Sequence, residues 1–268
     1  MLEELKKNWV SHTQADVQAR IWDRAAVDYG KKPLPDLQKD PFLKALSEAA
    51  SLTEQTRTLD VGCGAGGYSL ALAPFVGEAV GVDISGGMIG AAKARCQELG
   101  IHNARFDCIN WNDADIDKLN FRGRFQVVFA HMTPAICDYD TLEKMDACSK
   151  HLCMLEKPTR RRDRVLDGAL GTVGIGSSGS YDSDLIHIFT YLWCKGYCPQ
   201  FAYKEEVWDY ERSTEEMIAW CTDRARLRKE LTQAEEQTIA AFVEGLARDG
   251  KVNEQTTTTR VTIIWKKE

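Results

Sequence analysis

Leu59-Asp60-Val61-Gly62-Cys63-Gly64-Ala65-Gly66-Gly67 is the stretch of sequence that decides the fold. Apolar strand residues lead into a glycine-rich turn, and a helical pattern follows over 67–74. Glycine suits such a turn because it adopts positive φ without strain and because a ligand can lie directly on a backbone that has no Cβ atom. The stretch therefore predicts a strand, a ligand-binding turn and a helix.

Short apolar strands alternate with helical stretches after this point, which is typical of parallel βαβ units. We expect strands at 57–61, 78–83, 104–109, 125–130 and 151–155, a sixth strand in FAYKEEVWDY, and a last one in the C-terminal TTTTRVTIIWKK. We expect helices at 67–74, 86–99, 139–149, 184–195 and 233–248. The pattern predicts an α/β fold with a doubly wound, mostly parallel sheet.

Four segments are expected along the chain. Residues 1–55 are polar and helix-prone and predict an N-terminal helical cap, and residues 56–156 form the Rossmann-like core. Residues 157–212 begin with the arginines of 160–164 and a glycine-rich run, so they predict a flexible loop and a cap insertion with strand six. Residues 213–268 supply helices and the last strand. Whether the 168–180 loop is a lid over the site is left open.

Composition narrows the function classes. The chain has 34 basic and 40 acidic residues and a net charge of -6, which would repel a phosphate backbone, so nucleic acid is not an expected partner. Nine cysteines without a paired CxxC framework indicate reduced, cytoplasmic usage and no metal site. A signal peptide and an apolar membrane span are not expected. The oligomeric state is not indicated.

Two acidic residues distinguish between possible ligands of the glycine turn. Gly62, Gly64 and Gly67 also satisfy the GxGxxG pattern of dinucleotide-binding proteins. Asp60 at the strand tip would repel a pyrophosphate but suits an ammonium group. Asp83, at the end of the second strand, can accept both hydroxyls of a ribose. Asp83 alone would suit NAD equally well, whereas Asp60 favours a cationic nucleoside such as S-adenosylmethionine (SAM).

Three motifs follow one another in order over roughly residues 50–155: LDVGCGAGG, VDISGGM and the strand FQVVFAHMTP. In this region the chain resembles the class I SAM-dependent methyltransferases. The resemblance implies a seven-stranded sheet with the last strand inserted antiparallel, SAM as cofactor and S-adenosylhomocysteine (SAH) as product. It also implies that Gly62 and Gly64 form the floor under the cofactor, that Asp60 lies near its amino acid moiety and that Asp83 binds its ribose.

The adenine end of this implied site is formed by Met88 and by a pair of residues after strand three. The matching pair is Asn110-Trp111, where asparagine replaces the usual aspartate, with Asp107 as a competing candidate. The predicted cofactor-binding residues are Asp60, Gly62, Cys63, Gly64, Gly66, Asp83, Ile84, Met88, Asn110, Trp111 and Ala130.

After strand four the family places residues beside the transferable methyl group, here Ala130 to Pro134. HMTP lacks the Asn/Asp-Pro-Pro-Tyr/Phe motif of nucleic-acid and protein amide N-methyltransferases, which favours a small-molecule acceptor. A general base is required only if the acceptor loses a proton, and His131 is the first candidate, followed by Tyr29 and His12. Tyr29 also matches an aromatic residue that closes over SAM in many small-molecule members.

The sequence therefore predicts a SAM-dependent methyltransferase that acts on an unidentified small molecule by in-line displacement. Two alternatives stay open at this point. One is a SAM- or SAH-binding sensor without turnover. The other is an NAD(P)-dependent oxidoreductase, against which stand Asp60 and the lack of a Tyr-x-x-x-Lys motif.

Overall fold

The computed structural model describes residues 1–11, 14–176 and 181–267 and divides the chain into two compact units. The first unit comprises Met1–Lys157, Asp184–Ala202 and Thr262–Glu268, and the second comprises Pro158–Ser183 and Tyr203–Val261. Three strands, β5, β6 and β7, contribute residues to both units. No helix among the described residues combines the length and the apolar character needed to span a bilayer.

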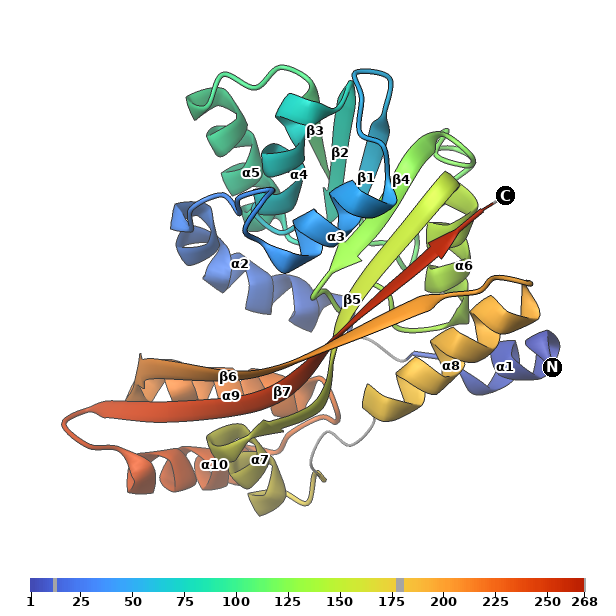
Figure 1. Ribbon diagram of the computed structural model, residues 1–268. Coiled ribbons are helices and arrows are strands. Elements are labelled where there is room, and N and C mark those ends of the chain that lie inside the picture. Colours follow the sequence, from blue (N-terminus) through green and yellow to red (C-terminus); the bar gives the residue numbers. More distant parts are fainter. Residues whose placement is uncertain (12–13, 177–180, 268) are drawn as a thin grey trace. The chain divides into compact units, whose positions relative to one another are not determined.

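The sheet has seven strands in the order β3-β2-β1-β4-β5-β7-β6. Their bounds are β1 Arg57–Val61, β2 Glu78–Asp83, β3 Ala104–Cys108, β4 Phe125–His131, β5 Ser149–Asp163, β6 Gln200–Ser213 and β7 Lys251–Lys266. The pairs β1–β2, β1–β4, β2–β3 and β4–β5 are parallel, whereas β6 and β7 run in opposite directions (Figure 1). The predicted mostly parallel α/β sheet is confirmed.

The helices are α1 Leu2–Asn8, α2 Ala15–Lys31, α3 Pro41–Ala49, α4 Gly67–Leu72, α5 Gly86–Glu98, α6 Tyr139–Cys148, α7 Arg164–Thr172, α8 Tyr181–Cys194, α9 Thr214–Arg226 and α10 Gln233–Leu246, and a 3-10 turn covers Ala73–Phe75. Side-chain caps fix several of the starts. Asp40 accepts from the N–H of Leu43 at α3, and Ser85 accepts from the N–H of Met88 at α5, so local polar residues define where each helix begins.

The central strands of the first unit are buried on both faces, as expected for a parallel sheet between helices. Leu59, Val61, Val80 and Phe129 have no exposed surface. Helix α3 inserts Phe42, Leu43 and Leu46 against apolar residues of β4 and β5. The parallel pairing places the carboxyl ends of β1, β2 and β4 along one edge of the sheet.

The second unit is built on a separate apolar cluster contributed by α7, α9, α10 and β7. Val165, Leu166, Ala169 and Leu170 of α7 belong to it. A Cβ atom on Gly168 would lie 2.5 Å from Cζ of Phe242, so glycine here lets α7 and α10 approach closely.

The expectation of a loop from residue 157 is therefore wrong over its first part. Strand β5 continues to Asp163, and α7 follows at once and extends to Thr172. The glycines suggested a loop, but the apolar residues at helical spacing bury one face of α7, and this burial outweighs the weak helix propensity of glycine. Residues 177–180 of the expected lid lie outside the described residues.

Candidate active site

The turn after β1 brings three glycines into the left-handed region, with φ of +75° at Gly62, +53° at Gly64 and +74° at Gly66. The N–H groups of Gly62 and Cys63 donate to the carbonyl of Val82, at 2.8 and 3.0 Å, which ties the turn to β2. A Cβ atom on Gly66 would lie 2.8 Å from Cζ of Phe106. At Gly64 the nearest atom would be Sδ of Met88, at 3.9 Å, so the Gly64 backbone leaves room above it.

Two carboxylates, one buried and one half-buried, lie beside this turn. Asp60 on β1 is 2% exposed and accepts a hydrogen bond from Oγ of Ser69 at 2.8 Å. Asp83 at the end of β2 accepts from the N–H of Gly64 and the N–H of Ser85, both at 2.9 Å. Burial raises the pKa of Asp60 to about 7, and the charge of Asp83 adds to this rise. Burial also raises the pKa of Asp83, to which the charge of Asp23 adds.

Cys63 lies between these carboxylates in the sequence, and its thiol donates to the carbonyl of Gly64. Burial, and after it the negative charges of Asp60 and Asp83, raise the pKa of the thiol well above its usual range. Cys63 is therefore held as a neutral thiol and is a poor nucleophile. The chemistry of the site has to come from other residues.

Helix α2 carries a third carboxylate that the sequence analysis did not single out. Asp23 accepts from Oγ of Ser85 at 2.5 Å and from the N–H of Gly87 at 2.9 Å. A Cβ atom on Gly87 would lie 3.0 Å from Oδ1 of Asp23, so the two helices touch at this point. Asp23 thereby fastens α2 to the first turn of α5, beside which it lies in Figure 1.

The expected adenine residues have different surroundings. Met88 is 1% exposed and packs with Ala26 and Ala65. The side chain of Asn110 closes a local turn, with its amide donating to Asp113 and accepting from the N–H of Asn112. Trp111 is 3% exposed, and its indole donates to the carbonyl of Thr141 in α6 at 3.0 Å. Ile84 is half-buried beside Asp83, and Ala130 is fully buried in β4.

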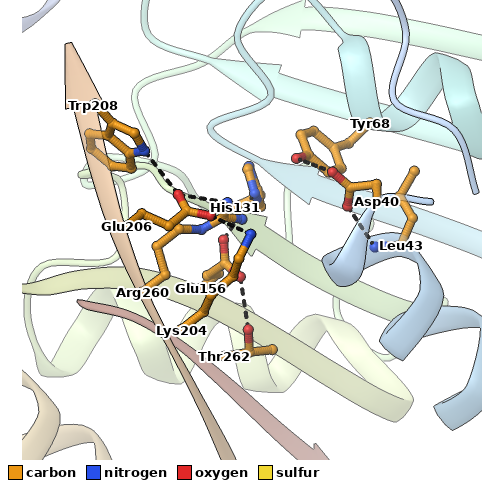
Figure 2. A network of polar contacts seen from close by, with 10 residues as sticks. All are labelled: Asp40, Leu43, Tyr68, His131, Glu156, Lys204, Glu206, Trp208, Arg260 and Thr262. Carbon is orange, nitrogen blue, oxygen red and sulfur yellow. Dashed lines mark hydrogen bonds and ion pairs between the residues drawn. The ribbon is translucent and has the colours of Figure 1, made fainter. Parts of the chain in front are cut away.

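His131, the last residue of β4, lies in a cluster of polar and aromatic side chains (Figure 2). Its Nε2 is 3.1 Å from Oε1 of Glu156, and their side chains are 15% and 4% exposed. The His131 ring lies 3.9 Å from the ring of Tyr68 and 4.8 Å from that of Phe42. Glu156 and Tyr68 were not among the predicted site residues, although Glu156 directly follows the strand expected at 151–155, where functional residues of such sheets gather.

The loop after β4 carries Thr133 to the glycine turn, because a Cβ atom on Gly62 would overlap the side chain of Thr133. Met132 has φ of +49°, and its N–H donates to the carbonyl of Glu156 at 2.9 Å. A non-glycine residue in the left-handed region is held there by its surroundings. This segment therefore joins the glycine turn of β1 to the middle of β5.

Tyr29 is not part of the His131 cluster. Its ring packs edge-on against Trp22 at 6.1 Å and lies under the ammonium of Lys32 at 3.7 Å. Tyr29 as a whole is 38% exposed. The third candidate base, His12, lies outside the described residues.

The arginines of 160–164 belong to the second unit. Arg161 pairs with Asp163 through two hydrogen bonds of 2.6 and 2.8 Å, while Arg160, Arg162 and Arg164 are exposed. All nine cysteines are free, and no group of three potential metal ligands occurs among residues 1–11, 14–176 and 181–267.

Residues 52–161 match the family model described as a methyltransferase domain. This part of the chain is therefore similar to methyltransferase domains. The enzyme class and the cofactor SAM that the sequence predicted are those of this domain family. The match includes the glycine turn, both carboxylates, His131 and Glu156.

Two curated relatives share this domain. A 23S rRNA (uracil(1939)-C(5))-methyltransferase of Xanthomonas axonopodis pv. citri is 31% identical over 110 residues, which cover 39% of this chain and 24% of the relative. An uncharacterised methyltransferase of Bacillus subtilis is 39% identical over 64 residues, 24% of this chain and 25% of the relative. The chain thus spans about a quarter of the length of each.

The whole chain resembles solved methyltransferases in its fold. The geranyl diphosphate C-methyltransferase of Streptomyces coelicolor A3(2), crystallised with Mg2+, geranyl diphosphate and SAH, superposes with a TM-score of 0.50 at 15% identity. The alignment covers 97% of this chain and 99% of that protein. At 15% sequence identity, this similarity shows a shared fold alone.

Proposed function

We propose that this protein transfers the methyl group of SAM to a small-molecule acceptor and releases SAH. The observation that carries the proposal is a pair of carboxylates at the glycine turn, the buried Asp60 and the half-buried Asp83, the second of which accepts from the N–H of Gly64. A buried carboxylate is costly without an opposite charge. A ligand with an ammonium and a sulfonium group and no phosphate would offset that cost, whereas a pyrophosphate would increase it.

The chain's own residues fit the parts of such a ligand. Asp60 would accept from the ammonium group, and Asp83, which already orders Gly64 and Ser85, would accept from the ribose hydroxyls through its remaining lone pairs. Gly62, Cys63, Gly64 and Gly66 would form the floor under the ligand, and Ala130 its wall at β4. The adenine would be bounded by Ile84, Met88, Asn110 and Trp111. Trp111 would support this part of the site through its packing on α6.

When bound, SAM supplies a methyl group that its sulfonium already makes electrophilic. The task of the chain is then to align the acceptor with that methyl group, exclude water and remove a proton where the acceptor carries one. His131 fits the last role because it ends β4 next to the glycine turn of β1 and is mostly buried. Tyr29 would close over the cofactor from α2 through its ring.

An RNA acceptor is the second candidate, favoured by the relative that methylates 23S rRNA. The shared region is the methyltransferase domain, so it carries the cofactor chemistry and not the parts that select the acceptor. The net charge of -6 favours a small molecule, because phosphate contacts supply much of the affinity of RNA-binding proteins. Release of SAH from SAM with total RNA as the acceptor would overturn this preference.

A thermal-shift panel of SAM, SAH, NAD and NADP tests the proposal. A ligand at 100 times its dissociation constant stabilises the folded protein by about 2.7 kcal/mol. We expect stabilisation by SAM and SAH alone, and stabilisation by NAD instead of SAM would favour the oxidoreductase. Release of SAH from SAM in fractionated metabolite pools then separates an enzyme from a sensor, with Asp83→Ala as the inactive control.

A further inference from the structure

Asp23 on α2 completes the N-terminal cap of a different helix, α5. The first N–H groups of a helix have no partner within that helix. In α5, the N–H of Met88 donates to Oγ of Ser85 at 3.0 Å. The N–H of Gly87 donates to Oδ1 of Asp23 at 2.9 Å. The first turn of α5 therefore needs a residue of α2 for one of its hydrogen bonds, and the helix dipole favours a carboxylate there.

Asp23 is also linked to Asp83 through a single residue, Ser85. The hydroxyl of Ser85 donates to Oδ1 of Asp23 at 2.5 Å, and its backbone N–H donates to Oδ1 of Asp83 at 2.9 Å. The other oxygen of Asp83 accepts from the N–H of Gly64. Ser85 has no exposed surface, so solvent cannot replace these partners. The direction of the Asp83 carboxylate thus depends on an N–H group whose residue is held by Asp23.

Helix α2 contacts the glycine turn as well as α5. Ala26 on α2 packs with Ala65 of the turn and with Met88 of α5. Near the end of α2, Arg95 of α5 donates to the carbonyl of Lys32 at 2.8 Å and to the carbonyl of Ala65 at 3.0 Å. If α2 moved away, contacts with α5 and with the turn would be lost together. Docking of α2 is therefore connected to the shape of the turn.

We propose that Asp23 is a positioning residue for the cofactor: it holds Ser85, and through Ser85 the carboxylate of Asp83, so that docking of α2 and binding of the cofactor favour one another. This role rests on the proposed function, because it acts on the carboxylate assigned to the ribose. Coupling between two binding events is reciprocal. The free energy that docked α2 adds to cofactor binding is therefore the free energy that the cofactor adds to the docking of α2.

Asp23→Ala and Asp23→Asn test the hydrogen bonds and the charge separately. Both donors meet the same atom, Oδ1, and the amide oxygen of asparagine can accept from both. Isothermal titration with SAH is expected to give a dissociation constant about 10-fold higher for D23A than for the wild type. D23N is expected to bind within about twofold of the wild type. Asp28→Ala removes another exposed carboxylate of α2 and is the matched control, with unchanged affinity.

Amide hydrogen exchange over residues 15–31 separates positioning from stability. A ligand slows exchange in a segment only where local opening of that segment weakens binding. Saturating SAH is expected to slow exchange in α2 of the wild type by about 10-fold, and by less than about twofold in D23A. If Asp23 only stabilised α2, exchange would be faster in D23A and the effect of SAH would be unchanged.

A pair of glycine variants tests the same contact without removing a charge. A Cβ atom on Gly87 would lie 3.0 Å from Oδ1 of Asp23 and 3.2 Å from Cβ of Ala26. A Cβ atom on Gly90, in the same helix, would have nothing within 4 Å. Both replacements by alanine raise the helix propensity of α5. Gly87→Ala is expected to weaken SAH binding, and Gly90→Ala is expected to leave it unchanged. If D23A is poorly folded, this pair decides.

The role of Asp23 is refuted if D23A binds SAH as the wild type does, if D23N is as weak as D23A, or if SAH slows exchange in α2 equally in D23A and wild type. Equal SAH affinity of Gly87→Ala and Gly90→Ala has the same meaning. Wild-type protein that does not bind SAH refutes the proposed function. Normal binding by the wild type together with normal binding by D23A refutes the role of Asp23 alone.

Discussion

Buried carboxylates occur in both units of the molecule, but their partners differ. In the first unit, Asp60 is hydrogen-bonded to Ser69, and Asp83 accepts from two backbone N–H groups. Neither forms an ion pair with a cationic side chain in the described part of the chain. Burial accordingly raises the pKa of both groups.

In the second unit, Asp163 has a cationic partner, whereas Glu254, like Asp83, accepts from two backbone N–H groups and has a pKa that burial raises. Asp163 receives two hydrogen bonds from Arg161 and one from Thr256. Glu254 accepts the N–H groups of Val165 and Leu166, at the first turn of α7, at 3.0 to 3.1 Å. These carboxylates connect β5 and β7 to a helix, which is a structural role.

The difference indicates where a ligand belongs. A carboxylate that caps a helix or pairs with arginine stabilises the fold by itself, whereas one that is buried with few partners destabilises the fold until a cation arrives. Asp60 and Asp83 therefore reduce the stability of the empty protein, and binding a cationic cofactor recovers it. Four variants test this contrast.

Asp60→Asn should have the largest effect. The pKa of Asp60 is about 7 in the folded protein and 3.8 ordinarily, so the stability from its protonated form is fully present below pH 3.8 and is lost as the pH rises through 7. Asparagine abolishes this loss. At pH 8 we expect the free energy of unfolding of the variant to be higher than that of the wild type by on the order of 4 kcal/mol. At pH 3.5 we expect no difference in stability. We also expect the variant to bind SAM more weakly. Denaturant titrations at both pH values measure this stability difference. Equal stability of the two proteins at pH 8 would contradict the prediction.

Glu254→Ala, in the second unit, should destabilise the protein, whereas Asp60→Asn should stabilise it at pH 8. It leaves the N–H groups of Val165 and Leu166 without their acceptor, and a buried unsatisfied donor costs about 1 to 3 kcal/mol. We expect about 3 kcal/mol of destabilisation and an unchanged dissociation constant for SAH. Urea unfolding gives the free energy of unfolding, and isothermal titration calorimetry gives the dissociation constant for SAH. If fully folded Glu254→Ala protein bound SAH more weakly than the wild type, the contrast between structural and ligand-binding carboxylates would not hold.

Asp83→Ala should weaken SAH binding by about 1.5 to 3 kcal/mol, because charged hydrogen bonds to the ribose are lost. Isothermal titration measures the dissociation constant. Asp117→Ala, which removes an exposed carboxylate paired with Arg122, is the matched control and should bind as wild type does. Unchanged affinity in Asp83→Ala would mean that the ribose lies elsewhere.

Tyr29→Phe should have the smallest effect. The contacts of Tyr29 are made by its ring, with Trp22 and Lys32, so the hydroxyl contributes little. We expect turnover within about twofold of wild type and a stability change under about 0.5 kcal/mol. A tenfold fall in initial rate with normal SAH affinity would instead give this hydroxyl a part in proton transfer.

Much of the first unit could be predicted from the sequence, because its signals are local. Strand β1, the glycine turn and α4 follow one another directly, and Asp60 and Asp83 end adjacent strands whose apolar residues are continuous. Such short-range patterns reflect backbone geometry and burial, which neighbouring residues determine. His131 could be placed for the same reason, since it ends the fourth strand.

Only the tertiary structure decided which distant residues meet. Glu156 reaches His131 through strand register, and Asp23 reaches Ser85 and Gly87 from 62 and 64 residues away. Helix α7 forms across a glycine-rich segment because α10 packs against Gly168. Pairing, close approach and burial between remote segments depend on the assembled fold, and local sequence has no record of them.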